Sequence, residues 1–236
     1  MNWAKRMIEL EKKELKAWAL ARSIFGANQI ICEDAGRPNC FDPRTPFQNS
    51  IFLSSHGGLE FSYDSLEKLV GKGFSLPRMK SFFRSPILCF RSVFALLRIN
   101  NLYGVTEPSF HQVQAIFRAS VEATLAYANH HAEARGILMG ERGSISFVIK
   151  ELGELIRVGP RRGGLWEVLD ASVDEKPAVI LCFQNLQIAY LSALGQTNHL
   201  TDPVTGKFVL AGRIPLIEKF GFVSRLAFND LPMPKR

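Results

Sequence analysis

The sequence has few of the residues on which metal, redox and disulfide sites depend. It contains 4 cysteines and 5 histidines in 236 residues, and no two cysteines form a CxxC pair. The histidines show no ligand spacing relative to the cysteines, so a zinc-site pattern is absent. We expect reduced, structural cysteines, with a Cys32–Cys40 bridge as the alternative. We expect neither a bound metal nor a cofactor.

A long apolar run is also missing. No stretch approaches the roughly 18 uninterrupted apolar residues of a membrane-spanning helix. The first residues, MNWAKRMIELEKKELKAW, are charged throughout, which is unlike a secretory signal. We therefore expect a soluble, cytoplasmic chain whose contact with a membrane is peripheral.

Acidic residues are absent from one basic segment. From Lys68 to Arg98 the sequence has seven basic side chains and no acidic one, with five phenylalanines between them, and the whole chain carries +7. Such a surface indicates an anionic partner, either a membrane or a nucleic acid. The candidate docking residues are Lys80, Arg84, Arg91 and Arg98. The alternative is a plain helix that packs on its Phe/Leu face and exposes its arginines.

Convergent catalytic groups are lacking as well. His130-His131 falls at a predicted helix end, where the helix dipole favours a capping role. Ser54-Ser55-His56 has no surrounding GxSxG elbow, and Asp170 and Asp174 read as solvated loop acids. The two Gly-Lys pairs lack the remaining residues of a phosphate loop. We predict that the chain is not an enzyme.

The first 140 residues show apolar side chains at helical spacing. This pattern predicts helices over residues 2–25, over 86–99 after the Ser85 N-cap, and from Thr106-Glu107-Pro108 to about His130 and Gly136. Residues 34–62 read as a loop-rich stretch, for which a functional and a disordered role stay open.

After Gly143 the apolar period changes from helical to alternating. The pattern predicts a strand over 145–149 with one solvent-exposed face, further strands over 155–158 and 165–170, and an interior strand over 178–183. A helix capped by Asn185 follows, then the strand GKFVLAG, apolar on both faces and so a candidate for burial on both, and a helix over 215–229. We expect an α+β fold, with a helical region over 1–140 and a mainly antiparallel sheet of about five strands covered by helices over 141–236.

The order of these segments along the chain is similar to that of a known family of domains. The pair SISFVIKELGELIRV is followed by LWEVLD, by KPAVILCF leading into NLQIAYLSALG, by a loop with Asp202-Pro203, by GKFVLAG and by an apolar closing helix. This series, over residues 140–230, resembles the sterol carrier protein two family of lipid-binding and transfer domains. The resemblance implies that the Gly-Lys strand lies at the sheet edge and that the closing helix borders a hydrophobic tunnel.

Two features depart from this family. The closing segment, RIPLIEKFGFVSRLAFNDL, has a proline in its first turn, and the first 140 residues match nothing in the family. A helical cap, a homodimerisation element and a docking arm are the three alternatives for that region.

A tunnel of this kind would have an apolar lining. The residues that we expect to line it are Phe147, Ile149, Ile180, Cys182, Ala189, Tyr190, Leu210, Leu216, Phe220 and Phe222. Ordinary core packing is the alternative for each, because a core and a lipid tunnel use the same residue types. Tyr190 would place its hydroxyl at a ligand headgroup.

These observations predict non-enzymatic binding and transfer of a hydrophobic ligand, namely a fatty acyl chain, a sterol-like molecule or an isoprenoid. The basic segment would dock on an anionic membrane. The alternative is a regulatory or scaffold protein whose basic helices bind nucleic acid or a protein partner.

Overall fold

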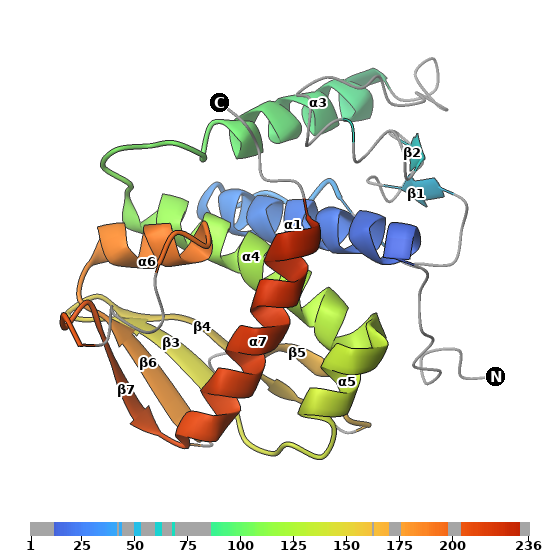
Figure 1. Ribbon diagram of the computed structural model, residues 1–236. Coiled ribbons are helices and arrows are strands. Elements are labelled where there is room, and N and C mark those ends of the chain that lie inside the picture. The colour runs from blue at the N-terminus through green and yellow to red at the C-terminus, as the bar shows by residue number, and fades with distance from the viewer. Residues whose placement is uncertain are drawn as a thin grey trace.

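The computed structural model describes residues 12–41, 43, 50–52, 60–62, 68, 86–161, 163–169, 176–197 and 204–231. Lys80, Arg84, Ser54-Ser55-His56, Asp170 and Asp174 lie outside the described residues, as does the first part of the predicted N-terminal helix. Figure 1 shows a sheet with helices stacked on one side of it, and α3 farthest from the sheet.

The first helix, α1 (Lys12–Asp34), continues well past its predicted end at Phe25. Ala27 and Ile30 prolong its buried side, so packing rather than local sequence sets the end of the helix. The stretch predicted as loop contains the short strands β1 (Ser50–Phe52) and β2 (Glu60–Ser62), which pair antiparallel.

Three helices follow: α3 (Pro86–Asn100), α4 (Phe110–His130) and α5 (Ala132–Leu138). The prediction for α3 is confirmed, whereas α4 begins later than Thr106. Its N-cap is Ser109, which forms a reciprocal capping box with Gln112. His131 ends α4 and caps α5, where its Nδ1 accepts a hydrogen bond from the Ala134 N–H at 3.4 Å. His131 therefore has a capping role, but its side chain caps the start of α5 and not, as predicted, the end of the preceding helix.

The main sheet has five strands, in the order β5-β4-β3-β6-β7. They are β3 (Ile145–Ile149), β4 (Gly153–Pro160), β5 (Trp166–Leu169), β6 (Val179–Phe183) and β7 (Phe208–Gly212). β3 and β6 pair parallel and the other neighbours pair antiparallel. With α6 (Leu186–Ala193) and α7 (Ile214–Asp230), this confirms the α+β fold. The interior position of β6 and the edge position of the Gly-Lys strand, β7, are also confirmed.

The burial of side chains on the two faces of the sheet differs from the prediction. On β7, Val209 is 59% exposed, so this strand is not buried on both sides. On β3, Ser146 is only 3% exposed, so the prediction of a solvent-exposed face on this strand is wrong at this position. The reason is a polar group on the neighbouring strand: Ser146 Oγ hydrogen-bonds to Glu154, whose carboxylate also accepts from Arg157 Nε at 2.9 Å.

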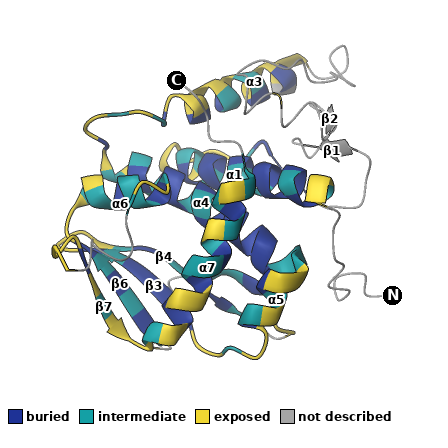
Figure 2. Ribbon diagram, viewed as in Figure 1, coloured by how far each residue is buried: buried dark blue, intermediate teal, exposed yellow. Residues whose placement is uncertain are grey.

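Helix α4 lies at the centre of the core. Its Phe117 ring lies 5.1 Å from the Phe147 ring and 5.5 Å from the Phe183 ring, both on the sheet. A single cluster of buried apolar residues joins α1, α4, the inner face of the sheet and α7, and a smaller one lies between α1 and α3 (Figure 2). None of the four cysteines forms a disulfide. Among the described helices, none has the length and apolarity needed to cross a bilayer.

Candidate functional site

The inner face of the sheet, between the strands and α7, holds five of the ten predicted tunnel residues, namely Phe147, Ile149, Leu210, Leu216 and Phe220. Phe147 and Phe220 approach with ring centroids 6.1 Å apart. Phe147, Leu216 and Phe220 are 6%, 0% and 4% exposed, and Ile149 is fully buried as well. These four side chains belong to the main cluster of buried apolar residues. At the centre of the face, core packing accounts for all of them.

Exposure increases from the centre of this inner face toward the edge of the sheet. Phe147, Leu181 and Leu210 form one row across β3, β6 and β7. Phe147 and Leu181 are 6% and 7% exposed, whereas Leu210 is half-buried and packs against the cluster. The row is therefore an uninterrupted apolar strip that begins in the core and ends at the open edge.

Ile180 and Cys182 do not lie on this face. Side chains alternate along a strand, so both point to the outer face, away from α4 and α7. Their register partners there are Ala211 and Val209 on the edge strand. Both residues are half-buried. The structure thus places these two predicted lining residues on the opposite face of the sheet from Phe147, Ile149 and Leu210.

On α6, Ala189 and Tyr190 are buried. The Tyr190 hydroxyl donates to the Leu102 carbonyl at 3.0 Å and accepts from the Val105 N–H at 3.1 Å. These bonds fasten α6 to the connection between α3 and α4 and use the hydroxyl internally. Desolvation, with a further contribution from Tyr190, raises the pKa of nearby Tyr103 to about 12.

Helix α7 is held by polar contacts near its two ends, and between them by apolar contacts and by a 3.4 Å hydrogen bond between Thr124 Oγ1 and Ser224 Oγ. Near its start, Glu141 accepts hydrogen bonds from Arg213 and Lys219. The pKa of the Glu141 carboxyl lies below its ordinary value, and the hydrogen bond from Lys219 is the largest cause. The middle of the helix rests on Leu216, Phe220, Val223 and Ala227. Phe222 is half-buried beside the guanidinium of Arg225, which lies 6.0 Å from its ring centroid.

At the far end of α7, Asp230 contacts two other helices. Its carboxylate accepts from Tyr127 Oη at 3.3 Å and pairs with Lys12 Nζ at 2.8 Å. Desolvation acts to raise the pKa of Asp230, but the hydrogen bond and charge of Lys12, with the charge of Lys16, hold it below its ordinary value. Burial raises the pKa of Tyr127, and the Asp230 charge adds to this.

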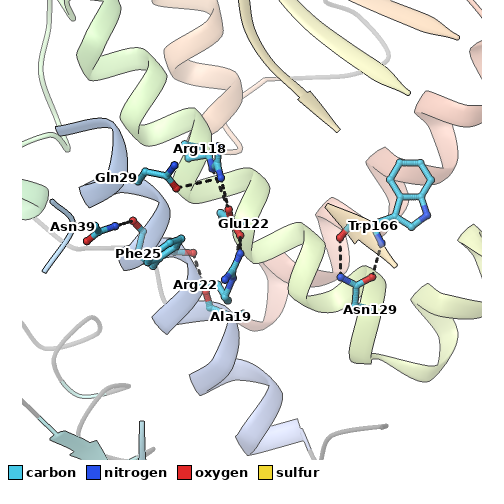
Figure 3. Close-up of polar contacts among 10 residues, drawn as sticks. Ala19, Arg22, Phe25, Gln29, Asn39, Arg118, Glu122, Asn129 and Trp166 are labelled. Carbon is cyan, nitrogen blue, oxygen red and sulfur yellow. Dashed lines mark hydrogen bonds and ion pairs between the residues drawn. The ribbon is translucent and has the colours of Figure 1, made fainter. Parts of the chain in front are cut away.

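A buried carboxylate that the sequence analysis missed lies between α1 and α4 (Figure 3). Glu122 is 1% exposed, and its two oxygens accept from Arg22 Nε and Arg118 Nε, each at 3.0 Å. Arg118 also reaches Gln29 Oε1 at 3.4 Å. The sequence did contain an indication of this buried ion cluster, because Glu122 is an acidic residue inside an apolar helix face and Arg118 lies four positions before it.

Asn129, farther along α4, is a second polar contact that the sequence did not reveal. It accepts from the Trp166 N–H and donates to the Trp166 carbonyl, both at 2.9 Å (Figure 3). This side chain satisfies both backbone groups at the start of β5 and fixes that strand to α4.

The outer side of α3 is apolar and exposed. Ile87, Phe94 and Leu97 are 75%, 62% and 55% exposed, and Phe90 is 55% exposed. The side that faces α1 carries Cys89, Ser92, Ala95 and Ile99, all buried. The alternative in which this helix packs on its Phe/Leu face is therefore wrong at Phe94 and Leu97. Arg91 and Arg98 are exposed too.

No family model matches the chain, and no curated protein matches it at a significant level. Among solved structures, a double mutant of the sec-alkyl sulfatase PisA1 aligns with a TM-score of 0.35 and 15% identity, over 57% of this chain and 21% of the other. The stereoselective inverting sec-alkylsulfatase Pisa1 from Pseudomonas sp. aligns with a TM-score of 0.29 and 15% identity, over 58% and 28% of the two chains. The chain thus spans less than a third of the length of these structures, and such low scores carry no conclusion about its activity.

Proposed function

We propose that this chain binds an apolar ligand between helix α7 and the edge of the sheet and carries it without chemical conversion. The observation that carries the proposal is the strip Phe147–Leu181–Leu210, which runs from the closed core to a half-buried position on the edge strand. An acyl chain, a sterol-like molecule or an isoprenoid would extend along this strip. The element order that resembles sterol carrier protein two domains also supports the proposal.

The contacts of α7 suit such a ligand. Polar contacts hold the helix near its ends, at Glu141 and Asp230, and a 3.4 Å hydrogen bond joins Ser224 to Thr124 of α4, while the other buried side chains of α7 are apolar. A ligand that enters beneath Leu216 and Phe220 replaces apolar contacts by apolar contacts and leaves these polar contacts in place. Burial of its tail contributes about 0.8 kcal/mol per methylene.

Two substitutions on neighbouring positions of β7 test this proposal. Leu210→Trp adds volume on the inner face, where the ligand would lie, and Val209→Trp adds the same side chain on the exposed outer face. We expect Leu210→Trp to weaken binding of a fluorescent fatty acid at least about tenfold, because overpacking blocks the strip. Val209→Trp is expected to bind as the unchanged chain does.

Native mass spectrometry of the gently purified protein provides the second readout, as added mass that Leu210→Trp reduces. Thermal unfolding of both variants checks that the fold is intact. An unchanged protein that carries no added mass and binds no fluorescent fatty acid would contradict the proposal. Equal loss in the two tryptophan variants would place the ligand elsewhere.

A further inference from the structure

Helix α3 faces α1 with mainly small side chains and leaves several of its large apolar ones exposed. The buried side of the helix consists of Cys89, Ser92, Ala95 and Ile99, and the exposed side has Ile87, Phe94 and Leu97. A helix that serves only the core would show the opposite distribution. A contiguous exposed apolar surface of this kind marks an interaction site.

The exposed side is narrow and ordered. At 100° per residue, Ile87, Phe90, Arg91, Phe94, Leu97 and Arg98 fall within an arc of about 120° on the helix. The arginines occupy one border of this arc, two turns and about 10.5 Å apart along the axis. The apolar side chains fill the remainder. The helix thus presents an apolar strip with a cationic border on one side.

The charge around this strip identifies its partner. Helix α3 contains no acidic residue, and none occurs anywhere between Lys68 and Arg98. Stacking on nucleobases uses aromatic rings, and the aliphatic Ile87 and Leu97 contribute little to it. A bilayer interface accepts aliphatic and phenyl side chains below the headgroups, while guanidinium groups meet the phosphates of anionic lipids.

We propose that the outer face of α3 docks on an anionic lipid surface, with Ile87, Phe94 and Leu97 inserted at the acyl boundary and Arg91 and Arg98 at the headgroups. The docking proposal rests on the proposed function and extends it, because it names the kind of membrane from which the ligand is taken. In Figures 1 and 2, α3 lies on the opposite side of α1 from the sheet. The docked protein therefore holds its sheet away from the membrane.

Sedimentation with lipid vesicles is the first test. We expect the full chain to sediment with vesicles rich in phosphatidylserine and not with pure phosphatidylcholine, and the bound fraction to fall with added salt. Replacing both arginines, Arg91→Gln with Arg98→Gln, weakens binding by about fivefold for each. Replacing Ile87→Ser with Phe94→Ser weakens it at least about tenfold.

Matched controls use exposed residues away from α3. Met139→Ser with Leu152→Ser removes apolar side chains that are 79% and 51% exposed, and Arg142→Gln with Lys176→Gln removes two exposed charges. Both double variants are expected to keep the vesicle binding of the unchanged chain. Far-ultraviolet circular dichroism verifies that all variants are folded.

Tryptophan fluorescence measures insertion directly. In Phe94→Trp the emission should shift to the blue on phosphatidylserine vesicles and be quenched by brominated acyl chains. In Val209→Trp, on the outer face of the sheet, neither change is expected. An equal response at both positions would overturn the assigned face.

Three other outcomes overturn the docking proposal: no vesicle binding by the unchanged chain, binding indifferent to every α3 variant, or retention on RNA or DNA without retention on vesicles. A dimer in size-exclusion chromatography that Ile87→Ser with Phe94→Ser dissociates would overturn it as well, because a second copy would then cover the face. Fatty acid binding is measured in parallel. Ligand binding without vesicle binding refutes only the docking, and the reverse result refutes only the carrier function.

Discussion

Glu122 is an acidic side chain within an apolar helix face, and its burial depends on two arginines. Arg22 comes from α1 and Arg118 from α4 itself, so the carboxylate joins the two helices. The side chains of Arg22 and Arg118 are 31% and 16% exposed, so neither is fully buried. Arg22 also lies 5.1 Å from the Phe25 ring centroid, a cation–π distance.

Neutralising Glu122 should destabilise the protein strongly. Glu122→Gln leaves two cations facing a buried amide, and we expect a loss of about 3 kcal/mol in the free energy of unfolding. Urea unfolding at neutral pH measures it. The control, Glu33→Gln, changes an exposed glutamate on α1 that accepts from Gln29 at 2.8 Å, and a change within about 0.5 kcal/mol is expected there. Equal losses in the two variants would show that the ion cluster does not stabilise the fold.

Individual side chains also show where sequence reasoning stops. The apolar alternation on β7 placed Leu210 and Val209 on opposite faces correctly, but Val209 is exposed because none of the described helices packs on the outer face of the sheet. Tyr190 was predicted at a ligand headgroup, whereas its hydroxyl bonds to the backbone of a loop distant in sequence. The residues next to Tyr190 in the sequence give no indication of a hydrogen-bond partner that lies far away along the chain.

At the scale of elements, the packing of α1 on α4 depends on one glycine. A Cβ at Gly26 would lie 2.7 Å from Glu122 Cγ and 3.1 Å from Arg118 Cγ. The lack of a side chain at this position allows the two helices to approach at the point where the ion cluster lies. The glycine is thus a close-contact residue in the interior of a helix, where glycine is otherwise unfavourable.

Adding a single methyl group should therefore separate these helices. We expect Gly26→Ala to lower the free energy of unfolding by about 1–3 kcal/mol through overpacking. Gly136→Ala is the matched control on α5, because nothing lies within 4 Å of its Cβ position. In that exposed helix alanine should stabilise by about 0.5–1 kcal/mol. Thermal and urea unfolding measure both. Stabilisation by Gly26→Ala would contradict the close contact.

The elements themselves were the most predictable level of this fold. Caps and alternation located α3, α6, α7 and the strands, because Asn185 and the apolar periods act over a few residues. Helix α1 and the pair β1–β2 were mispredicted, since their limits depend on packing and on pairing with distant residues. The candidate site was predictable only in part. Alternation gives the face of each side chain, but not whether a neighbouring element covers that face.

For the molecule as a whole, Asp230 connects three helices. Its carboxylate meets Tyr127 of α4 and Lys12 of α1 from the end of α7. Because its pKa is lowered in the folded state, the carboxylate stabilises the fold at pH values above its ordinary pKa of 3.8. This stabilisation disappears as the pH falls through the lower pKa of the folded state.

Asp230→Asn should accordingly reduce the loss of stability in acid. The variant lacks the stabilising charge at neutral pH, so its free energy of unfolding is lower there and falls less steeply below pH 3.8. Tyr127→Phe removes one hydrogen bond and leaves the Lys12 contact, so a smaller change in the same direction is expected. Urea unfolding at a series of pH values gives the slopes. An acid slope in Asp230→Asn identical to that of the unchanged chain would exclude this role.

Helix α4 receives its partners from both directions along the chain. Arg22 and Glu122 are 100 positions apart, and Tyr127 and Asp230 are 103 positions apart. During synthesis, therefore, α4 emerges with α1 already available, the sheet strands that pack on Phe117 follow, and the part of α4 that contacts α7 is completed last. Because such distant contacts form slowly, the last steps of folding wait for the final helix. A nascent chain that is stalled before α7 leaves exposed the apolar surface of α4 and of the sheet that α7 would cover, and exposed apolar surface of this kind favours aggregation.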